Sequence, residues 1–182
     1  AHLTTFLLLV AYSGISNAIA QNPFKAGFLS LEAEIVSKGN KAEPDGNLYE
    51  IDMPLLRLMR TNTEFPKGTA LILAGGGYEI LKMRNEGEKT ALFLNAEGFD
   101  AAVLEYSVSK LQNPNWALAD ALRAYRLLKT SGKAFGLDGK RLVLVGVSTG
   151  GHLAARLVQK LGDEEQPDDL ILISPTNLDE TP

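Results

Sequence analysis

Four short apolar segments restrict what this chain of 182 residues can fold into. These segments are Thr69–Leu73, Ala101–Tyr106, Leu142–Val147 and Leu170–Ser174. Nearly continuous apolar runs of this length are typical of strands that are buried on both faces, as in parallel sheets covered by helices. Strands and helices that alternate along a chain favour right-handed crossovers. The sequence therefore predicts an α/β fold with a mostly parallel central sheet flanked by helices.

Helical segments separate these strands, and one further strand is predicted before them at Leu55–Met59. Helices are predicted over Glu86–Glu97, from about Trp116 to Lys129, and over His152–Leu161. Gly98 and Gly162 follow the first and the third helix, as is common at helix C-termini. Asn113 and Pro114 provide the cap and the first turn of the second helix. In such sheets reactive groups gather at the carboxyl ends of the strands, so a site is expected in the turns that follow them.

The turn after Leu142–Val147 carries the pattern G-x-S-x-G, as Gly146-Val147-Ser148-Thr149-Gly150. The pattern by itself is weak, but here it follows a buried strand and opens a helix, which is the context of a nucleophile elbow. Glycines are needed two positions before and after the serine because side chains would collide in so tight a turn. A phosphate-binding loop or a dinucleotide fingerprint would need a lysine or a further glycine that this turn lacks. The pattern predicts that Ser148 is a catalytic nucleophile and that Gly146 and Gly150 form its elbow.

A second glycine-rich turn, Ala74-Gly75-Gly76-Gly77-Tyr78, directly follows the strand Thr69–Leu73. An esterase needs N–H donors where the carbonyl oxygen of its substrate becomes an oxyanion. These donors come from the residue after the nucleophile, here Thr149, and from the turn after an earlier strand. Glycines allow the backbone of that turn to approach a substrate closely. The two turns together favour a hydrolase over a purely structural turn.

Further segments accompany these two turns. They are Asn85-Glu86-Gly87-Glu88, Ala101–Tyr106, Ala117-Leu118-Ala119-Asp120-Ala121, Gly136-Leu137-Asp138 before Arg141, and the extended elbow segment at residues 146–155. Together with the glycine turn at residues 74–78, they resemble bacterial esterases of the acetylxylan-esterase-like group in the α/β-hydrolase superfamily. The resemblance covers about residues 48–182.

This resemblance implies hydrolysis of small acyl esters, in particular removal of acetyl groups from plant poly- or oligosaccharides. It also implies that the backbone N–H groups of Gly76, Gly77 and Thr149 form the oxyanion hole. The chemistry needs no metal or organic cofactor, and none is predicted. Two residues differ from related enzymes, because Ala74 replaces a histidine and Thr149 replaces a common alanine. Neither side chain is expected to remove a backbone donor.

The acid and the base of a catalytic triad are not identified in this sequence. In this fold an Asp or Glu and then a His follow the nucleophile along the chain. His152 comes four residues after Ser148 on the same predicted helix, so it is poorly placed to reach the hydroxyl and is interpreted as structural. By the resemblance, Asp179 comes too early to be the acid, and about two strands and a closing helix are expected beyond it. We therefore interpret the chain as part of a longer protein, with a naturally shortened relative as the alternative.

The first twenty residues are predicted to be a signal peptide. Leu3–Tyr12 is apolar but too short to span a membrane, and Ala18-Ile19-Ala20 forms an A-x-A cleavage site. A buried N-terminal helix or strand is the alternative. We expect a signal peptide over residues 1–20, an incomplete α/β-hydrolase domain over residues 21–182, and a secreted or periplasmic protein that begins at Gln21.

Composition excludes several other classes of protein. The sequence has no cysteine, which excludes disulfides, a thiolate nucleophile and cysteine-ligated zinc. A net charge of −4 gives no reason to expect nucleic acid as a partner, and the acidic residues at 163–165 and 168–169 are interpreted as a solvated loop. The predicted partner is a small acyl ester or an acetylated saccharide, without a membrane span. A peptidase, a long-chain lipase and a non-catalytic relative with a binding role stay open, because a fold does not determine a function.

Overall fold

The computed structural model of the protein describes residues 27–30, 41–51, 53–111, 113–137 and 140–175. The predicted signal peptide and Asp179 lie outside these ranges. In chain order the elements are β1 (Gly27–Ser30), β2 (Lys41–Ala42), β3 (Leu48–Tyr49), β4 (Leu55–Met59), β5 (Thr69–Leu73), β6 (Ile80–Leu81), the π-helical turn η1 (Met83–Glu88), α2 (Lys89–Ala96), β7 (Asp100–Glu105), α3 (Pro114–Ser131), the 3₁₀ turn η2 (Gly132–Phe135), β8 (Leu142–Val147), α4 (Thr149–Lys160), the 3₁₀ turn η3 (Asp163–Glu165) and β9 (Asp169–Ile173).

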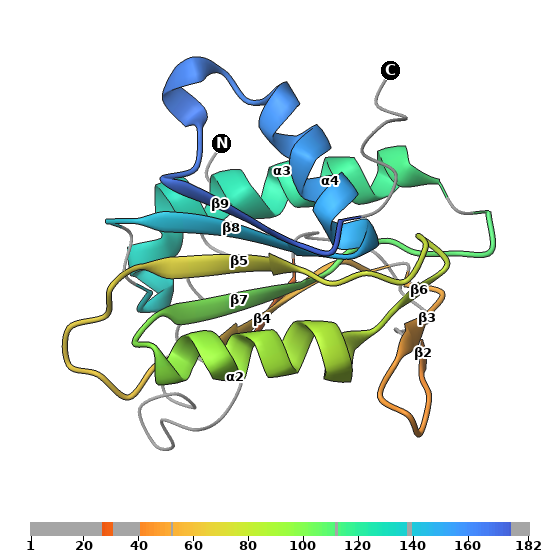
Figure 1. Ribbon diagram of the computed structural model, residues 1–182, viewed down its shortest axis with the longest axis horizontal. Coiled ribbons are helices and arrows are strands. Elements are labelled where there is room, and N and C mark those ends of the chain that lie inside the picture. The colour runs from red at the N-terminus through yellow and green to blue at the C-terminus, as the bar shows by residue number, and fades with distance from the viewer. Residues whose placement is uncertain (1–26, 31–40, 52, 112, 138–139, 176–182) are drawn as a thin grey trace, which may run out of the picture.

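The central sheet of the described residues has six strands in the order β1-β4-β7-β5-β8-β9. The strands β7, β5, β8 and β9 are parallel, whereas β4 pairs antiparallel with β7 and β1 pairs antiparallel with β4. Figure 1 shows α2 along one side of this sheet and α3 with α4 along the other. The predicted fold class, a mostly parallel sheet flanked by helices, is therefore confirmed.

The observed strands agree with the predicted ones to within one residue, and the helices differ more. β4, β5 and β8 have the predicted bounds, while β7 and β9 begin and end one residue earlier. The prediction of one continuous helix over Glu86–Glu97 is wrong, because its first part belongs to the π-helical turn η1. α4 begins at Thr149 rather than at His152, with Ser148 as its N-cap residue. α3 begins at Pro114 as the cap predicted, and the Asn113 side chain accepts a hydrogen bond from the Asn115 N–H at 3.0 Å.

The connections of the sheet change direction at β5. The chain runs from β5 through α2 to β7 on one side of this strand, and from β7 through α3 to β8 on its other side. β5 and β8 pair in parallel so that Leu73 lies opposite Gly146. The turns that follow β5 and β8 therefore lie side by side at the carboxyl edge of the sheet, which is where open parallel sheets bind ligands.

A small second sheet, in the order β2-β3-β6, lies beside this edge and was not predicted from the sequence. Its strand β6 begins two residues after the glycine turn, and Leu81 of β6 lies opposite Leu48 of β3. Two-residue strands give no periodic pattern that a sequence could reveal. The pairing of β6 determines where the chain goes once it leaves the glycine turn.

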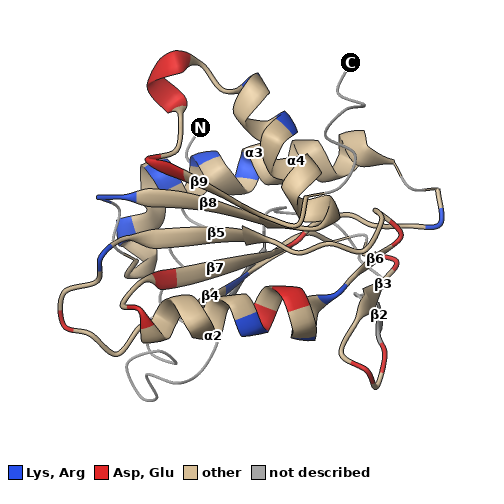
Figure 2. Ribbon diagram, viewed as in Figure 1, with Lys and Arg blue, Asp and Glu red and all other residues tan. Residues whose placement is uncertain are grey.

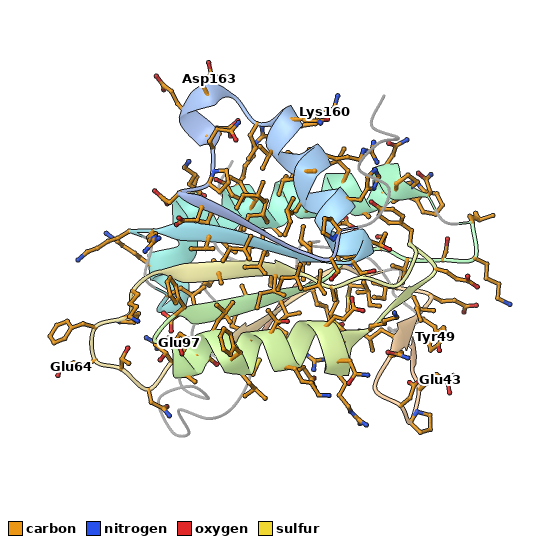
Figure 3. All side chains as sticks on the ribbon, in the orientation of Figure 1. Glu43, Tyr49, Glu64, Glu97, Lys160 and Asp163 are labelled. Carbon is orange, nitrogen blue, oxygen red and sulfur yellow. The ribbon has the colours of Figure 1, made fainter. Side chains whose placement is uncertain are left out.

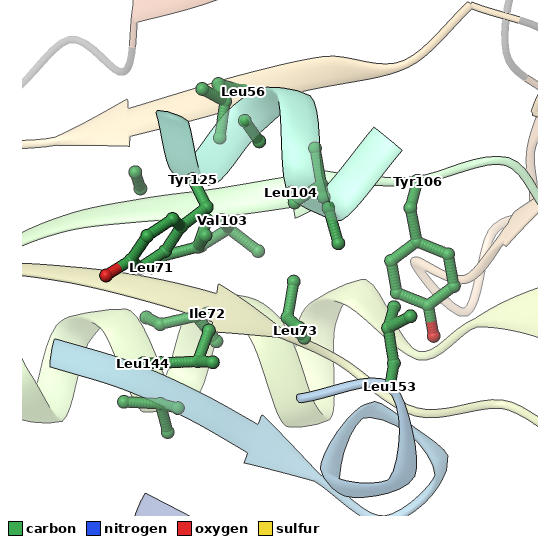
Figure 4. Packing of buried hydrophobic residues seen from close by; sticks show 14 of the residues in the cluster. Leu56, Leu71, Ile72, Leu73, Val103, Leu104, Tyr106, Tyr125, Leu144 and Leu153 are labelled. Atoms are coloured by element: carbon green, nitrogen blue, oxygen red, sulfur yellow. The ribbon is translucent and has the colours of Figure 1, made fainter. Parts of the chain in front are cut away.

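The core is built around the two central strands β5 and β7, every residue of which is buried. Figure 4 shows Leu71, Ile72 and Leu73 of β5 among the side chains of β7, β8 and the helices. Burial of a side chain of this size stabilises the fold by about 1.5–3 kcal/mol. Complete burial on both faces explains why these strands appear in the sequence as continuous apolar runs.

One ion pair with a buried carboxylate joins β4 to β7. Glu105 is 3% exposed, and its carboxylate accepts a hydrogen bond from the guanidinium of Arg57 at 2.7 Å. The same guanidinium also pairs with Glu88 of η1. Because a buried charge without its partner is strongly destabilising, Arg57 links the packing of β4, β7 and η1.

β9 lies at the end of the strand order, and its apolar side chains are partly exposed. Leu170, Ile171 and Ile173 have exposed fractions of 41%, 41% and 42%. By contrast, every residue of β5, an apolar run in the same sheet, is buried. β9 therefore presents an exposed apolar edge, unlike the buried strand that its apolar sequence predicted.

Acidic residues gather at η3 and at the start of β9, as Figure 2 shows. Glu165 accepts hydrogen bonds from Arg126, which lowers the pKa of Glu165 below its usual range. Asp169 pairs with Arg141 at 2.7 Å. The cluster lies at the surface as predicted, but part of it is paired rather than only solvated. None of the helices in the described ranges is both long and apolar enough to cross a membrane.

Candidate active site

Ser148 lies between β8 and α4 in a conformation that few residues other than glycine adopt. Its φ is +52° and its ψ is −122°. Such conformations cost about 1–3 kcal/mol and are concentrated at functional sites. The Ser148 N–H donates to the carbonyl of Ile173 at 2.9 Å, so β9 holds the elbow in this shape. The residue is half-buried.

Gly146 and Gly150 have no space for a side chain. A Cβ atom on Gly146 would lie 2.4 Å from the carbonyl oxygen of Gly150. A Cβ atom on Gly150 would lie 2.0 Å from the carbonyl oxygen of Leu73, the last residue of β5. These distances give the steric reason that was expected for the two glycines, namely contact of the elbow with itself and with the neighbouring strand.

The glycine turn after β5 lies against this elbow. A Cβ atom on Gly75 would lie 2.8 Å from the Cβ of Ser148 and 2.8 Å from the carbonyl oxygen of Val147. Gly76 and Gly77 have φ values of +138° and +69°, which favour glycine. At Gly76 a Cβ atom would also lie 2.1 Å from the carbonyl oxygen of Ile80. The structure thus brings the two sequence-predicted turns into contact around Ser148.

The three N–H groups predicted for the oxyanion hole differ in their present partners. The Gly77 N–H donates to the side-chain Oγ1 of Thr149 at 3.1 Å. For the N–H groups of Gly76 and Thr149, no acceptor is found among the described residues. The Thr149 N–H is in the first turn of α4, where amides have no acceptor within the helix and attract negative charge. The Thr149 side chain was not expected to remove a backbone donor, but its hydroxyl engages the Gly77 N–H.

His152 is bound to the glycine turn. Its Nδ1 lies 2.7 Å from the hydroxyl oxygen of Tyr78, and the two rings meet edge to face with centroids 5.9 Å apart. Burial raises the pKa of Tyr78 to about 12, although the nearby Arg156 opposes this shift. The hydroxyl therefore stays protonated at neutral pH. This contact agrees with the structural role predicted for His152.

The described residues leave the hydroxyl of Ser148 without a base. No hydrogen bond of the Ser148 Oγ is found within the described ranges. No group of three or more His, Cys, Asp or Glu that could hold a metal ion is present there either. The site as described therefore supplies a strained serine and N–H donors, but no hydrogen-bond partner for the serine hydroxyl.

Two side chains that hold the glycine turn by hydrogen bonds were not predicted from the sequence. The Tyr106 hydroxyl donates to the Ala74 carbonyl at 2.6 Å, and burial raises the pKa of Tyr106 well above its usual value. Glu86 accepts a hydrogen bond from the Gly75 N–H at 2.8 Å. Both residues lie in segments that carry the family resemblance, which was the available signal, but that resemblance assigned them no role.

A doubly wound sheet, a strained serine at its carboxyl edge and a glycine turn in contact with that serine together define an α/β hydrolase. A family model described as alpha/beta hydrolase fold matches residues 70–182, and the chain belongs to this family.

Individual relatives are esterases by name. An ethyl acetate hydrolase of Pseudomonas putida is 35% identical over 142 residues, which are 74% of this chain and 42% of that protein. An acetylxylan esterase of Xylanibacter ruminicola is 28% identical over 113 residues, which are 62% of this chain and 23% of that protein. The crystal structure of an acetyl ester-xyloside bifunctional hydrolase from Caldicellulosiruptor lactoaceticus has a TM-score of 0.62 at 26% identity, covering 84% of this chain and 58% of that one. The chain spans less than half the length of each curated relative that it matches.

Proposed function

We propose that this chain carries the nucleophile of a serine carboxylic-ester hydrolase. The observation that supports this most strongly is the strained conformation of Ser148, at φ +52° between two glycines and against a third. A turn that only connects a strand to a helix does not need a serine in a costly conformation. The glycine turn lies beside this serine, and its Gly76 N–H has no acceptor among the described residues. This arrangement fits acyl transfer.

In the proposed reaction, the Ser148 Oγ attacks the carbonyl carbon of an ester and gives up its proton to a general base. The carbonyl oxygen becomes an oxyanion that accepts hydrogen bonds from the N–H groups of Gly76 and Thr149. Gly77 adds a third donor if its N–H leaves the Thr149 hydroxyl. Collapse of the intermediate expels the alcohol, and water then releases the acid from the acyl-enzyme. The base is expected from outside the described residues, because His152 is engaged by Tyr78.

We propose small acyl esters as the substrate class, and acetylated plant poly- or oligosaccharides as the natural form. This part is supported by the names of the relatives, an ethyl acetate hydrolase and an acetylxylan esterase. A secreted or periplasmic protein that starts at Gln21 would meet such saccharides. N-terminal sequencing of the exported protein tests the location, and an intact N-terminus upstream of Ala20 would contradict it.

The test uses the protein expressed from its complete reading frame. Wild type is expected to hydrolyse p-nitrophenyl acetate and to release acetate from acetylated xylan, and Ser148→Ala is expected to lose on the order of a millionfold in kcat, as removal of a nucleophilic serine typically does. Faster turnover of octanoate than acetate esters would point to a lipase, and cleavage of peptides to a peptidase. Equal activity of wild type and Ser148→Ala would refute the assignment of the nucleophile.

A further inference from the structure

The orientation of the glycine turn at residues 74–78 depends on the contacts made by each of its peptide planes. Glycines allow such planes to rotate, so the direction of their N–H groups has to be fixed from outside. No cis peptide bond is present in the described ranges, and in a trans peptide the C=O and the N–H point in opposite directions. A contact at one end of a plane therefore determines the direction of the other end.

The Ala74–Gly75 plane is held at both ends. Its carbonyl accepts the hydroxyl of Tyr106 at 2.6 Å, and its N–H donates to the Oε2 of Glu86 at 2.8 Å. A hydrogen bond to a charged carboxylate is about twice as strong as one between neutral groups. A flip of this plane would break both contacts.

The next plane, between Gly75 and Gly76, carries an N–H group for which the described residues provide no acceptor. The Gly75 carbonyl accepts the Lys82 N–H at 3.0 Å, so the Gly76 N–H of the same plane points away from Lys82. The third plane is again held at both ends, because the Gly76 carbonyl accepts the Ile80 N–H at 3.1 Å and the Gly77 N–H donates to Thr149. Of these three planes, the middle one is held at one end by a contact among the described residues, which leaves its N–H available to an acceptor from outside them.

Glu86 is close enough to the nucleophile to set this arrangement. A Cβ atom on Gly75 would lie 2.6 Å from the Oε2 of Glu86 and 2.8 Å from the Cβ of Ser148, so carboxylate, turn and nucleophile meet around one point. The Glu86 side chain is 16% exposed, and its Oε1 lies 3.4 Å from the ammonium of Lys82. Glu86 belongs to the π-helical turn η1. Such turns are rare in proteins overall, and those that occur are often found at functional sites.

We propose that Glu86 is a positioning residue, which holds the Ala74–Gly75 plane so that the Gly76 N–H is aimed at the developing oxyanion. This inference rests on the proposed esterase function. An oxyanion exists only in the transition states of acylation and deacylation, so loss of Glu86 lowers kcat and leaves KM nearly unchanged. The amide oxygen of a glutamine can accept the same hydrogen bond, although a weaker one, so Glu86→Gln is expected to keep most of this positioning.

The test compares Glu86→Ala, Glu86→Met and Glu86→Gln in the protein from the complete reading frame, with p-nitrophenyl acetate as substrate. The Ala and Met variants are expected to lose about 10- to 100-fold in kcat, less than or close to the cost of removing one oxyanion donor. Their KM stays within about threefold of wild type, and Glu86→Gln recovers kcat to within about threefold. Hydrogen exchange of the peptide covering residues 74–78 is expected to be faster in the Ala and Met variants and nearly unchanged in the Gln variant.

The matched control is Glu97→Ala. Glu97 is an exposed carboxylate at the opposite end of α2 from η1, as Figure 3 shows, and its removal should leave kcat unchanged. A kcat of Glu86→Met within about threefold of wild type would overturn the proposal, and so would a Gln variant as slow as the Met variant. Met is used because it keeps the length of the side chain, so the comparison stands even where Ala fails to fold. Wild type without turnover, or turnover that survives Ser148→Ala, would instead refute the proposed function itself.

Discussion

Gly150→Ala should destabilise the protein severely, because its new Cβ would meet backbone rather than a movable side chain. The Cβ would lie 2.0 Å from the carbonyl oxygen of Leu73 and 2.8 Å from that of Ala74. Carbon and oxygen atoms normally approach to about 3.3 Å, so the first contact overlaps by more than about 1 Å. Adding a methylene to a packed core costs about 1–3 kcal/mol where side chains can yield. Since β5 or α4 itself has to shift here, we expect a loss of more than about 3 kcal/mol in the free energy of unfolding.

Urea unfolding followed by circular dichroism, on the protein from the complete reading frame, measures this loss. Gly132→Ala is the matched control, because a Cβ there would meet nothing within 4 Å and the backbone is already helical at φ −52°. That substitution should stabilise by about 0.4–1 kcal/mol, through a less flexible unfolded chain. A Gly150→Ala protein that unfolds within about 1 kcal/mol of wild type would show that the steric account of the elbow is wrong.

Other consequences of the structure can be measured in the same way. Arg57→Met should cost about 3–5 kcal/mol by removing the guanidinium that pairs with the buried carboxylate of Glu105, and the double variant with Glu105→Gln should recover much of that loss; equal stability of the single and double variants would contradict this. Thr149→Val should speed hydrogen exchange of the Gly77 amide and destabilise by about 0.5–1.5 kcal/mol, whereas Thr149→Ser keeps the acceptor and should match wild type in both measurements. Because burial raises the pKa of Tyr78 to about 12 from 10.0, the unfolded chain ionises first, and stability should fall as the pH rises from about 10 to 12; in Tyr78→Phe that fall should be smaller. Residues 21–182 expressed alone should bind a hydrophobic dye at β9, and a monomeric sample that melts cooperatively without dye binding would argue against an exposed apolar edge.

The placement of the two turns could be predicted because it depends on local patterns. Continuous apolar runs located β5 and β8, and the parallel pairing expected of such strands brings their carboxyl ends to the same edge. The glycines of the elbow followed from the steric needs of a strand-to-helix turn around Ser148. The start of α4 was predicted three residues late because Gly150 and Gly151 have low helix propensity. Tertiary contact overrides that propensity, since a Cβ at Gly151 would lie 2.8 Å from the Cβ of Pro175.

The direction of the donors in the glycine turn could not be predicted, for a physical reason. A glycine is compatible with either orientation of its peptide planes, so the residues of the turn do not encode which N–H faces the nucleophile. The peptide planes of the turn are held by hydrogen bonds to Tyr106, Glu86 and Thr149. Tyr106 directly follows β7, Glu86 lies in the π-helical turn η1, and Thr149 lies in the elbow. Each contact joins residues far apart in sequence and depends on the fold already being formed. The elbow and the turn are therefore local properties, whereas the proposed oxyanion hole depends on contacts that exist only in the assembled sheet edge.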